Sequence, residues 1–212
     1  MTPYYQDEIV TLYHGDNRQI HAWLDADILV TDPPYGIGYK SGWSDLSTVV
    51  GDDSTIPRNE ALNNWGKKPA LVFGSWRVQR PAGVRQILIW DKGDSAGMGD
   101  LSLPWGNHEE IYVLGAGWVG KRGSGVLRVP PIATTEHPTP KPVRLIERLI
   151  KHCPKGVVAD PFAGSGSTLV ACKQLGRRAI GVECVERYCA IAADRLRQGT
   201  FASLYCNSGV QS

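Results

Sequence analysis

A carboxylate, two prolines and an aromatic ring stand together at the end of a predicted strand. Residues 27–30 form a short apolar run typical of a buried strand, and Asp32, Pro33, Pro34 and Tyr35 follow it. Ionised Asp32 only accepts hydrogen bonds, and prolines have no N–H to compete with their carbonyls. These acceptors beside a flat ring suit an exocyclic amino group on a nucleobase. Taken alone, the motif is also compatible with a Pro-Pro turn capped by an aspartate.

A second group of residues follows another predicted strand. In chain order, the pattern indicates a strand at 157–160, a turn at 161–167, a helix at 168–175 and a strand at 178–182. Gly164 and Gly166 permit a tight turn and a close backbone approach to a ligand. Glu183 lies 19 residues after Gly164, where an acidic side chain can bind ribose hydroxyls. The order predicts an adenosine-containing cofactor. Leu169 replaces the third glycine of the dinucleotide fingerprint, which argues against NAD and FAD.

The elements that must position these groups alternate between strands and helices. Further strands are predicted at 9–13, 70–73, 86–90 and 110–114, and helices at 18–24, 59–67, 143–152 and 186–197. In open α/β sheets, ligands bind at the carboxyl ends of strands. Asp16 follows the first strand, where it is either the N-cap of the 18–24 helix or a ligand-binding residue.

Two segments have little periodicity. Residues 36–58 form a long predicted loop, a length typical of a binding loop or lid. Residues 115–128 are rich in glycine and predict a hairpin with a basic tip. Lys121, Arg122 and Arg128 in that segment either contact phosphate or form a solvated turn.

Composition sets the broad class. The 212 residues suffice for one domain with a full core. Lys and Arg number 23 against 21 Asp and Glu, a balance that permits a nucleic-acid partner without requiring one. The five scattered cysteines lack metal or disulfide spacing, so reduced cytosolic thiols and no metal are expected. No apolar run reaches the roughly 20 residues of a membrane span, and no signal-peptide core is present, which predicts a cytoplasmic protein without membrane partners.

The chain resembles the β-class amino-methylating DNA methyltransferases, which use S-adenosylmethionine to modify adenine N6 or cytosine N4. Residues 32–35 match the catalytic Asp/Asn/Ser-Pro-Pro-Tyr/Phe motif, and residues 162–166 match the Phe-x-Gly-x-Gly cofactor loop, in the β-class order. Residues 137–142 resemble the family's His-Pro-Thr-x-Lys-Pro segment. Residues 14–16, 90–92 and 108–109 resemble further motifs, so that the resemblance covers nearly all of residues 8–197.

The resemblance implies one Rossmann-like α/β methyltransferase domain over residues 1–198, with a polar tail at 199–212. The expected sheet is mostly parallel, with helices on both faces and circularly permuted motif order. The implied catalytic residues are Asp32, Pro33, Pro34 and Tyr35. The implied S-adenosylmethionine-binding residues are Asp16, Asp32, His137, Lys141, Asp160, Phe162, Ala163, Gly164, Ser165, Gly166 and Glu183. Candidates for DNA phosphate contact are Lys40, Lys121, Arg122 and Arg128.

The expected substrate is a base flipped out of double-stranded DNA in a bacterial or phage-type host cell. Asp32, rather than serine, favours adenine N6 by resemblance; cytosine N4 is the nearest alternative, followed by an RNA or a protein amide. Intact motif residues argue against a non-enzymatic partner subunit. The recognition insert, at about 116–136, is too short for a separate domain. We therefore expect relaxed specificity, or readout completed by the 36–58 loop or by the second subunit of a homodimer.

Overall fold

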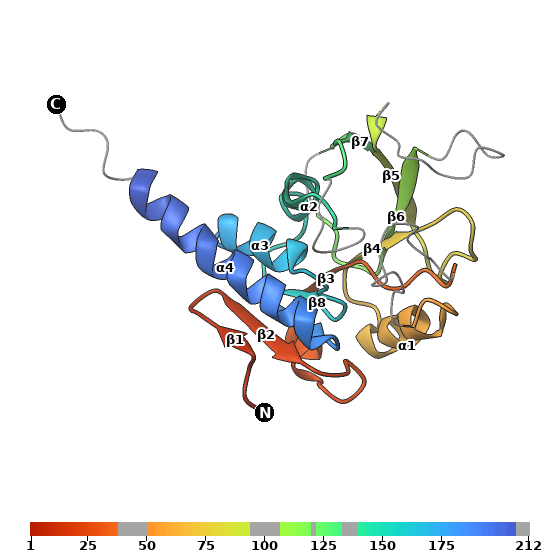
Figure 1. Ribbon diagram of the computed structural model, residues 1–212. Coiled ribbons are helices and arrows are strands. Elements are labelled where there is room, and N and C mark those ends of the chain that lie inside the picture. Colours follow the sequence, from red (N-terminus) through yellow and green to blue (C-terminus); the bar gives the residue numbers. More distant parts are fainter. Residues whose placement is uncertain (38–50, 94–106, 120–121, 133–139, 207–212) are drawn as a thin grey trace.

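The alternating strands and helices build one mixed sheet with helices on its two faces (Figure 1). The computed structural model describes residues 1–37, 51–93, 107–119, 122–132 and 140–206, the last eight as backbone only. The strands are β1 (Tyr5–Gln6), β2 (Val10–His14), β3 (Ile28–Thr31), β4 (Ala70–Gly74), β5 (Gln86–Asp91), β6 (His108–Leu114), β7 (Val126–Arg128), β8 (Val158–Asp160) and β9 (Ala179–Glu183). Their order across the sheet is β1-β2-β9-β8-β3-β4-β6-β5-β7.

Most neighbouring strands run parallel, as the resemblance to the methyltransferase family implies. The strands β2, β9, β8, β3 and β4 form a continuous parallel block. Strand β6 is antiparallel to both β4 and β5, and β7 is parallel to β5. The parallel strands and β5 therefore end at the same edge at which β6 begins, and we call this the carboxyl edge.

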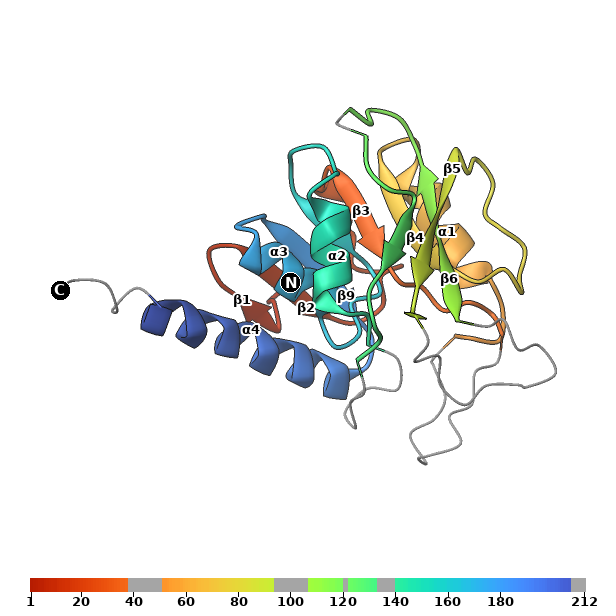
Figure 2. The ribbon, with the colours of Figure 1, turned by 90° about the horizontal axis from the view of Figure 1, so that it is seen from above.

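Helices cover both faces of the sheet (Figure 2). The helices are α1 (Ile56–Trp65), α2 (Val143–Ile150), α3 (Ser167–Gln174) and α4 (Glu186–Cys206), with a short 3₁₀ helix, η1 (Ala22–Asp25). The core beneath α2, α3 and α4 includes Leu145, Leu169 and Leu196. On the other face, Trp23 of η1 stacks on Trp65 of α1 with ring centroids 5.9 Å apart. Every helix among the described residues is too short or too polar to cross a membrane.

The helix predicted at 18–24 is wrong. Turns follow Asp16, and only η1 is helical in this segment. Ile20 and Trp23 are buried, and the Trp23 indole N–H donates to the Asn17 carbonyl at 3.1 Å. The apolar side chains thus reach the core from a closed turn, without the longer helix that their spacing favoured.

The predicted hairpin at 115–128 is also wrong, because β5 lies between β6 and β7. The chain crosses to the far side of β5 and pairs with it in parallel. Leu127 is buried there, and the Trp90 indole N–H donates to the Val129 carbonyl at 2.8 Å. Burial of an apolar residue and pairing of a buried indole therefore fix β7 at the sheet's end.

Two boundaries differ from the sequence predictions. Helix α1 begins at Ile56, inside the predicted 36–58 loop, with Pro57 in its first turn, where proline is favoured. Helix α4 continues to Cys206, so that part of the expected polar tail is helical.

Candidate active site

Strand β3 delivers Asp32 and Tyr35 to the carboxyl edge, where they meet two residues from distant segments. Asp32 Oδ2 accepts a hydrogen bond from Lys141 Nζ at 2.6 Å. The Tyr35 hydroxyl lies 2.8 Å from Asp32 Oδ1 and 2.8 Å from Glu109 Oε2. Lys141 Nζ is also 3.3 Å from Glu109 Oε2, and the lysine side chain is only 7% exposed. A charged cluster thus surrounds the predicted catalytic carboxylate.

A second ammonium group balances this cluster. Lys92, just beyond β5, pairs with Glu109 Oε1 at 2.7 Å. Two carboxyl groups, from Asp32 and Glu109, therefore face two lysines in a largely buried setting. Such groups are retained inside a protein only when they are paired.

The two carboxyl groups differ in proton affinity. Burial raises the pKa of Asp32, and repulsion from Glu109 adds to the effect, while Lys141 opposes it. Burial also acts to raise the pKa of Glu109, but attraction from Lys141 and Lys92 outweighs it and holds that pKa below its usual value. Burial and the neighbouring carboxylates raise the pKa of Tyr35, which keeps its hydroxyl protonated. Asp32 is thus the better proton acceptor of the pair.

Aromatic rings surround the lysine. Lys141 Nζ lies 5.4, 5.3 and 5.9 Å from the ring centroids of Tyr35, Phe73 and Trp90. Such distances give a favourable cation–π attraction. Phe73 and Trp90 are buried, whereas Tyr35 is half-buried. Of these three rings, Tyr35 therefore has the face best placed to receive a planar substrate.

The predicted cofactor loop lies beside this cluster, between β8 and α3. Gly164 and Gly166 have φ angles of 51° and 82°, in the left-handed region that favours glycine. A Cβ on Gly166 would lie 2.8 Å from the Cβ of Ala192 in α4. Glu183, at the end of β9, accepts the N–H groups of Gly164 and Val185 at 2.7 and 2.8 Å. The bare glycine backbone and adjacent acidic side chain fit an adenosine-type cofactor.

Asp160 connects the two motifs. Its Oδ1 accepts the Thr31 hydroxyl at 2.7 Å and the Phe162 N–H at 3.2 Å. Thr31 directly precedes Asp32, so this bond ties β3 to β8. Burial raises the pKa of Asp160 to about 6, although its hydrogen bonds act in the opposite direction.

The other predicted residues of the loop have structural partners. Ala163 is buried in the core, and Phe162 packs on the opposite face of the sheet. The carbonyl and hydroxyl oxygens of Ser165 accept hydrogen bonds from Arg195 Nη1 of α4, at 2.6 and 3.1 Å. Helix α4 thus holds the loop from behind. In the catalytic motif, Pro33 is buried and Pro34 half-buried.

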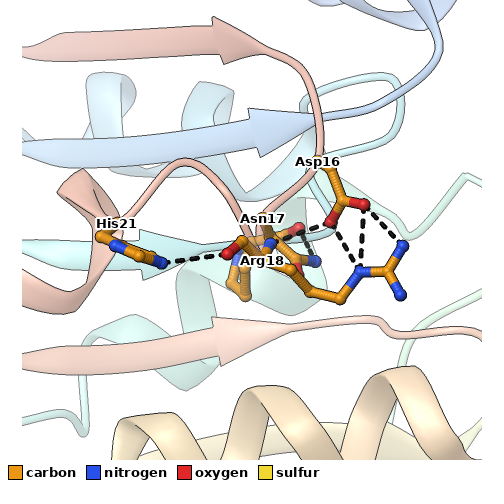
Figure 3. Close-up of polar contacts among 5 residues, drawn as sticks. Asp16, Asn17, Arg18 and His21 are labelled. Carbon is orange, nitrogen blue, oxygen red and sulfur yellow. Dashed lines mark hydrogen bonds and ion pairs between the residues drawn. The ribbon is translucent and has the colours of Figure 1, made fainter.

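Asp16 follows β2 at the same edge, but it does not cap a helix. It pairs with Arg18, whose Nη2 lies 2.6 Å from Asp16 Oδ2 (Figure 3). The Arg18 side chain lowers the pKa of Asp16. Neighbouring Asn17 donates from Nδ2 to the Pro161 carbonyl at 2.9 Å, which fixes this turn against the cofactor loop. Sequence reasoning missed Asn17, and its spacing gives no signal for this contact.

The candidates for DNA contact lie at different edges. Arg128 ends β7 at the carboxyl edge, with its Nε 3.7 Å from Asp91 Oδ2. Arg122 lines a cavity of about 510 Å³ next to the start of β5 and the end of α2, at the opposite edge. Lys40, Lys121 and His137 lie outside the described residues.

Glu109 and Lys92 are functional candidates to which sequence reasoning assigned no role. Both stood in segments that resemble family motifs, and this was the available signal. Within the described ranges, no group of three or more His, Cys, Asp or Glu side chains is arranged to hold a metal ion. Cys153, Cys172, Cys184 and Cys189 are free thiols.

A Rossmann-like sheet with an amino-group acceptor and a glycine loop at one edge defines a class of S-adenosylmethionine-dependent methyltransferases. The family model described as DNA methylase matches residues 106–194. The putative methylase YubD of Escherichia coli (strain K12) is 33% identical over 196 residues, covering 80% of this chain and 81% of that protein. The type II methyltransferase M2.LlaDCHI of Lactococcus lactis subsp. cremoris is 44% identical over 251 aligned positions, covering 93% of each chain. The chain therefore belongs to the N6/N4 DNA methyltransferase family, and its cofactor is S-adenosylmethionine.

Solved structures show the same fold. The M1.HpyAVI–SAM complex superposes with a TM-score of 0.66 at 24% identity, covering 89% of this chain and 99% of that one. The cytosine-N4-specific PvuII DNA methyltransferase gives a TM-score of 0.66 at 15% identity, covering 94% and 93%. These neighbours confirm the predicted Rossmann-like architecture.

Proposed function

We propose that this DNA methyltransferase modifies the N6 amino group of adenine in double-stranded DNA. The observation that carries the proposal is the carboxylate at position 32, held beside a half-buried tyrosine at the end of β3. Asp32 and the Pro33 carbonyl would accept the two N–H bonds of a flipped-out base, and Tyr35 would stack on its ring. Each carboxylate oxygen has a further lone pair, so that Lys141 and the substrate can share Asp32.

S-adenosylmethionine supplies an electrophilic methyl group when it is bound. The chain's task is then to orient a weak nucleophile, because the amino lone pair is delocalised into the base. Accepting both N–H bonds favours a pyramidal nitrogen whose lone pair can point at the methyl group. Orientation and preorganised charge are each large contributions to catalysis.

We propose a separate role in cofactor binding for each of the following residues. Glu183 would accept the ribose hydroxyls, and the Gly164–Gly166 backbone would approach the adenosine. Lys141 is a candidate for the methionine carboxylate. Since its ammonium already contacts Asp32 and Glu109, that role requires it to share or exchange partners.

Substitution of Asp32 tests the catalytic assignment. Asp32→Ala should lower methyl transfer to duplex DNA by at least about a hundredfold, the usual range for loss of a positioned acid–base group. Binding of S-adenosylmethionine, measured by calorimetry, should be retained. Asp25→Ala, at an exposed position in η1, is the matched control. Near-normal turnover of Asp32→Ala would overturn the assignment.

Nucleoside mass spectrometry of the methylated DNA tests the choice of base. N6-methyladenine supports the proposal. N4-methylcytosine would instead establish the second candidate, which uses the same acceptor cluster on a different ring.

A further inference from the structure

The Tyr35 hydroxyl faces more acceptors than it has hydrogens. A hydroxyl has one hydrogen, yet this oxygen lies 2.8 Å from a carboxyl oxygen of Asp32 and 2.8 Å from one of Glu109. If Tyr35 donates to one carboxylate, the other contact is favourable only when that second carboxyl carries a proton. The three groups therefore form a continuous hydrogen-bonded chain suited to holding one shared proton.

We propose that Glu109 is a positioning residue that receives, through the Tyr35 hydroxyl, the proton that the methylated amino group gives to Asp32. The proposal rests on the Asp32 role described above and deepens it, and it applies to either base. Glu109 does not touch the substrate in this scheme. It acts by keeping Asp32 available as a base.

The proton balance closes without another reactant. Transfer forms an N–C bond, breaks the C–S bond with its electron pair left on sulfur, and leaves the amino nitrogen with one excess proton. Asp32 accepts that proton. Asp32 Oδ1 then passes a proton to the Tyr35 oxygen while Tyr35 passes its own hydrogen to Glu109 Oε2. Asp32 is again a carboxylate, and Glu109, with a side chain 16% exposed, releases the proton to water.

The surrounding charges favour the first and last steps of this transfer, which are proton uptake by Asp32 and proton release from Glu109. Release to water drives the intermediate step from Asp32 to Glu109, which runs against the difference between their pKa values. Tyr35 and Asp32 follow β3, Lys92 follows β5, and Lys141 precedes α2, and these groups surround Glu109. Asp160, at the end of β8, adds its carboxyl charge near Asp32. The repulsion from Glu109 raises the pKa of Asp32, so that Asp32 accepts a proton readily. The two lysines favour the ionised form of Glu109, which returns it to the ready state.

The test measures the single-turnover rate of DNA methylation against pH for the wild type, Glu109→Gln, Tyr35→Phe and the double variant. Each single variant should lose about a hundredfold in rate, and the double variant should lose no more than either. In Glu109→Gln the acid limb should move to lower pH, because the charge that raises the pKa of Asp32 is gone. Cofactor affinity, measured by calorimetry, should remain within about twofold of the wild-type value, since Glu109 does not hold the cofactor.

Glu110→Gln is the matched control. Glu110 is the next residue of β6, and its carboxylate pairs with Arg80 at 2.6 Å, so the variant loses a carboxylate and an ion pair without touching Tyr35. Equal rate losses in Glu109→Gln and Glu110→Gln, an unmoved acid limb, or losses that multiply in the double variant would each overturn the proposed relay. Wild-type protein that transfers no methyl group would overturn the Asp32 assignment and the relay together.

Discussion

At the scale of single residues, the carboxyl groups of the carboxyl edge differ because their partners differ. Asp16 pairs with an exposed arginine, which lowers its pKa. At Asp160 burial dominates and raises the pKa to about 6, although the neutral donors Thr31 and Phe162 act to lower it. At Asp32, burial and the nearby Glu109 carboxylate raise the pKa, while Lys141 acts to lower it. Burial therefore raises the pKa of Asp32 and Asp160, whereas the charged partner Arg18 lowers the pKa of Asp16.

Substitution of Asp160 by asparagine tests this reading. The folded pKa, about 6, exceeds the ordinary value of 3.8, so the stabilising contribution is full below 3.8 and is lost as pH rises through 6. Asparagine keeps an acceptor for Thr31 but does not titrate. The wild type should therefore lose on the order of 3 kcal/mol of unfolding free energy relative to Asp160→Asn across that window. Urea unfolding of the cofactor-free protein at a series of pH values measures it.

Asp7 provides the control of opposite sign. Lys173 and Tyr5 help to hold its pKa at about 2, below the ordinary 3.8, despite partial burial. Its contribution is present above 3.8 and lost as pH falls through 2. Asp7→Asn should therefore be less stable than the wild type at neutral pH, and this difference in unfolding free energy should shrink in acid. Asp160→Asn should be more stable than the wild type at neutral pH, relative to acid, and this difference should also shrink as the pH falls. Parallel pH trends in the two variants would contradict this account.

At the scale of elements, the turn from β8 into α3 is fixed by its glycines and by α4 behind it. Gly166 is the N-cap of α3 with φ 82°, and the nearest atom to an added Cβ belongs to Ala192 of α4. The left-handed backbone at Gly166 and the close approach of α4 thus both depend on the absence of a side chain at this position. The same turn places the Gly164 N–H on Glu183.

Gly166→Ala should therefore destabilise the protein and weaken S-adenosylmethionine binding. Left-handed backbone alone costs about 1–2 kcal/mol for an L-residue, and the 2.8 Å contact with Ala192 adds to it. Gly176→Ala is the control, because Gly176 has φ 63° but nothing within 4 Å of an added Cβ. Thermal unfolding and calorimetry with the cofactor measure both effects. Equal losses in the two variants would show that the approach of α4 is irrelevant.

Sequence periodicity succeeded where an element's own side chains decide its structure. Strand β4 and helix α2 have apolar patterns that match their burial, and both were predicted within two residues at each end. The three-residue β7 was missed because its pairing with β5 depends on contacts far along the chain. The same distinction applies to the candidate site. Asp32 and Glu183 could be predicted because each follows or ends a predicted strand. The contacts of Glu109 with Tyr35 and of Lys141 with Asp32 could not, because they join residues 74 and 109 positions apart.

At the scale of the whole molecule, the candidate site residues are concentrated at the carboxyl edge. The proposed catalytic cluster, the proposed cofactor loop and Arg128 all lie there, whereas Arg122 lines the cavity at the opposite edge. Strand β7 also occupies part of the expected 116–136 insert, which leaves less chain for DNA recognition. We therefore still expect relaxed specificity, or readout completed by residues 36–58 or by a second subunit.

This geometry predicts different roles for the two arginines in DNA binding. Arg128 lies at the carboxyl edge, where we propose that the base binds, so Arg128→Ala should weaken duplex binding and reduce the slope of log affinity against log salt by about 0.9, the value for one phosphate contact. Arg122→Ala should leave both quantities unchanged. Fluorescence anisotropy with a labelled duplex at several salt concentrations measures them. If Arg122→Ala reduces the slope and Arg128→Ala does not, DNA contacts the cavity edge, and the duplex must then extend around the molecule to present its base at Asp32.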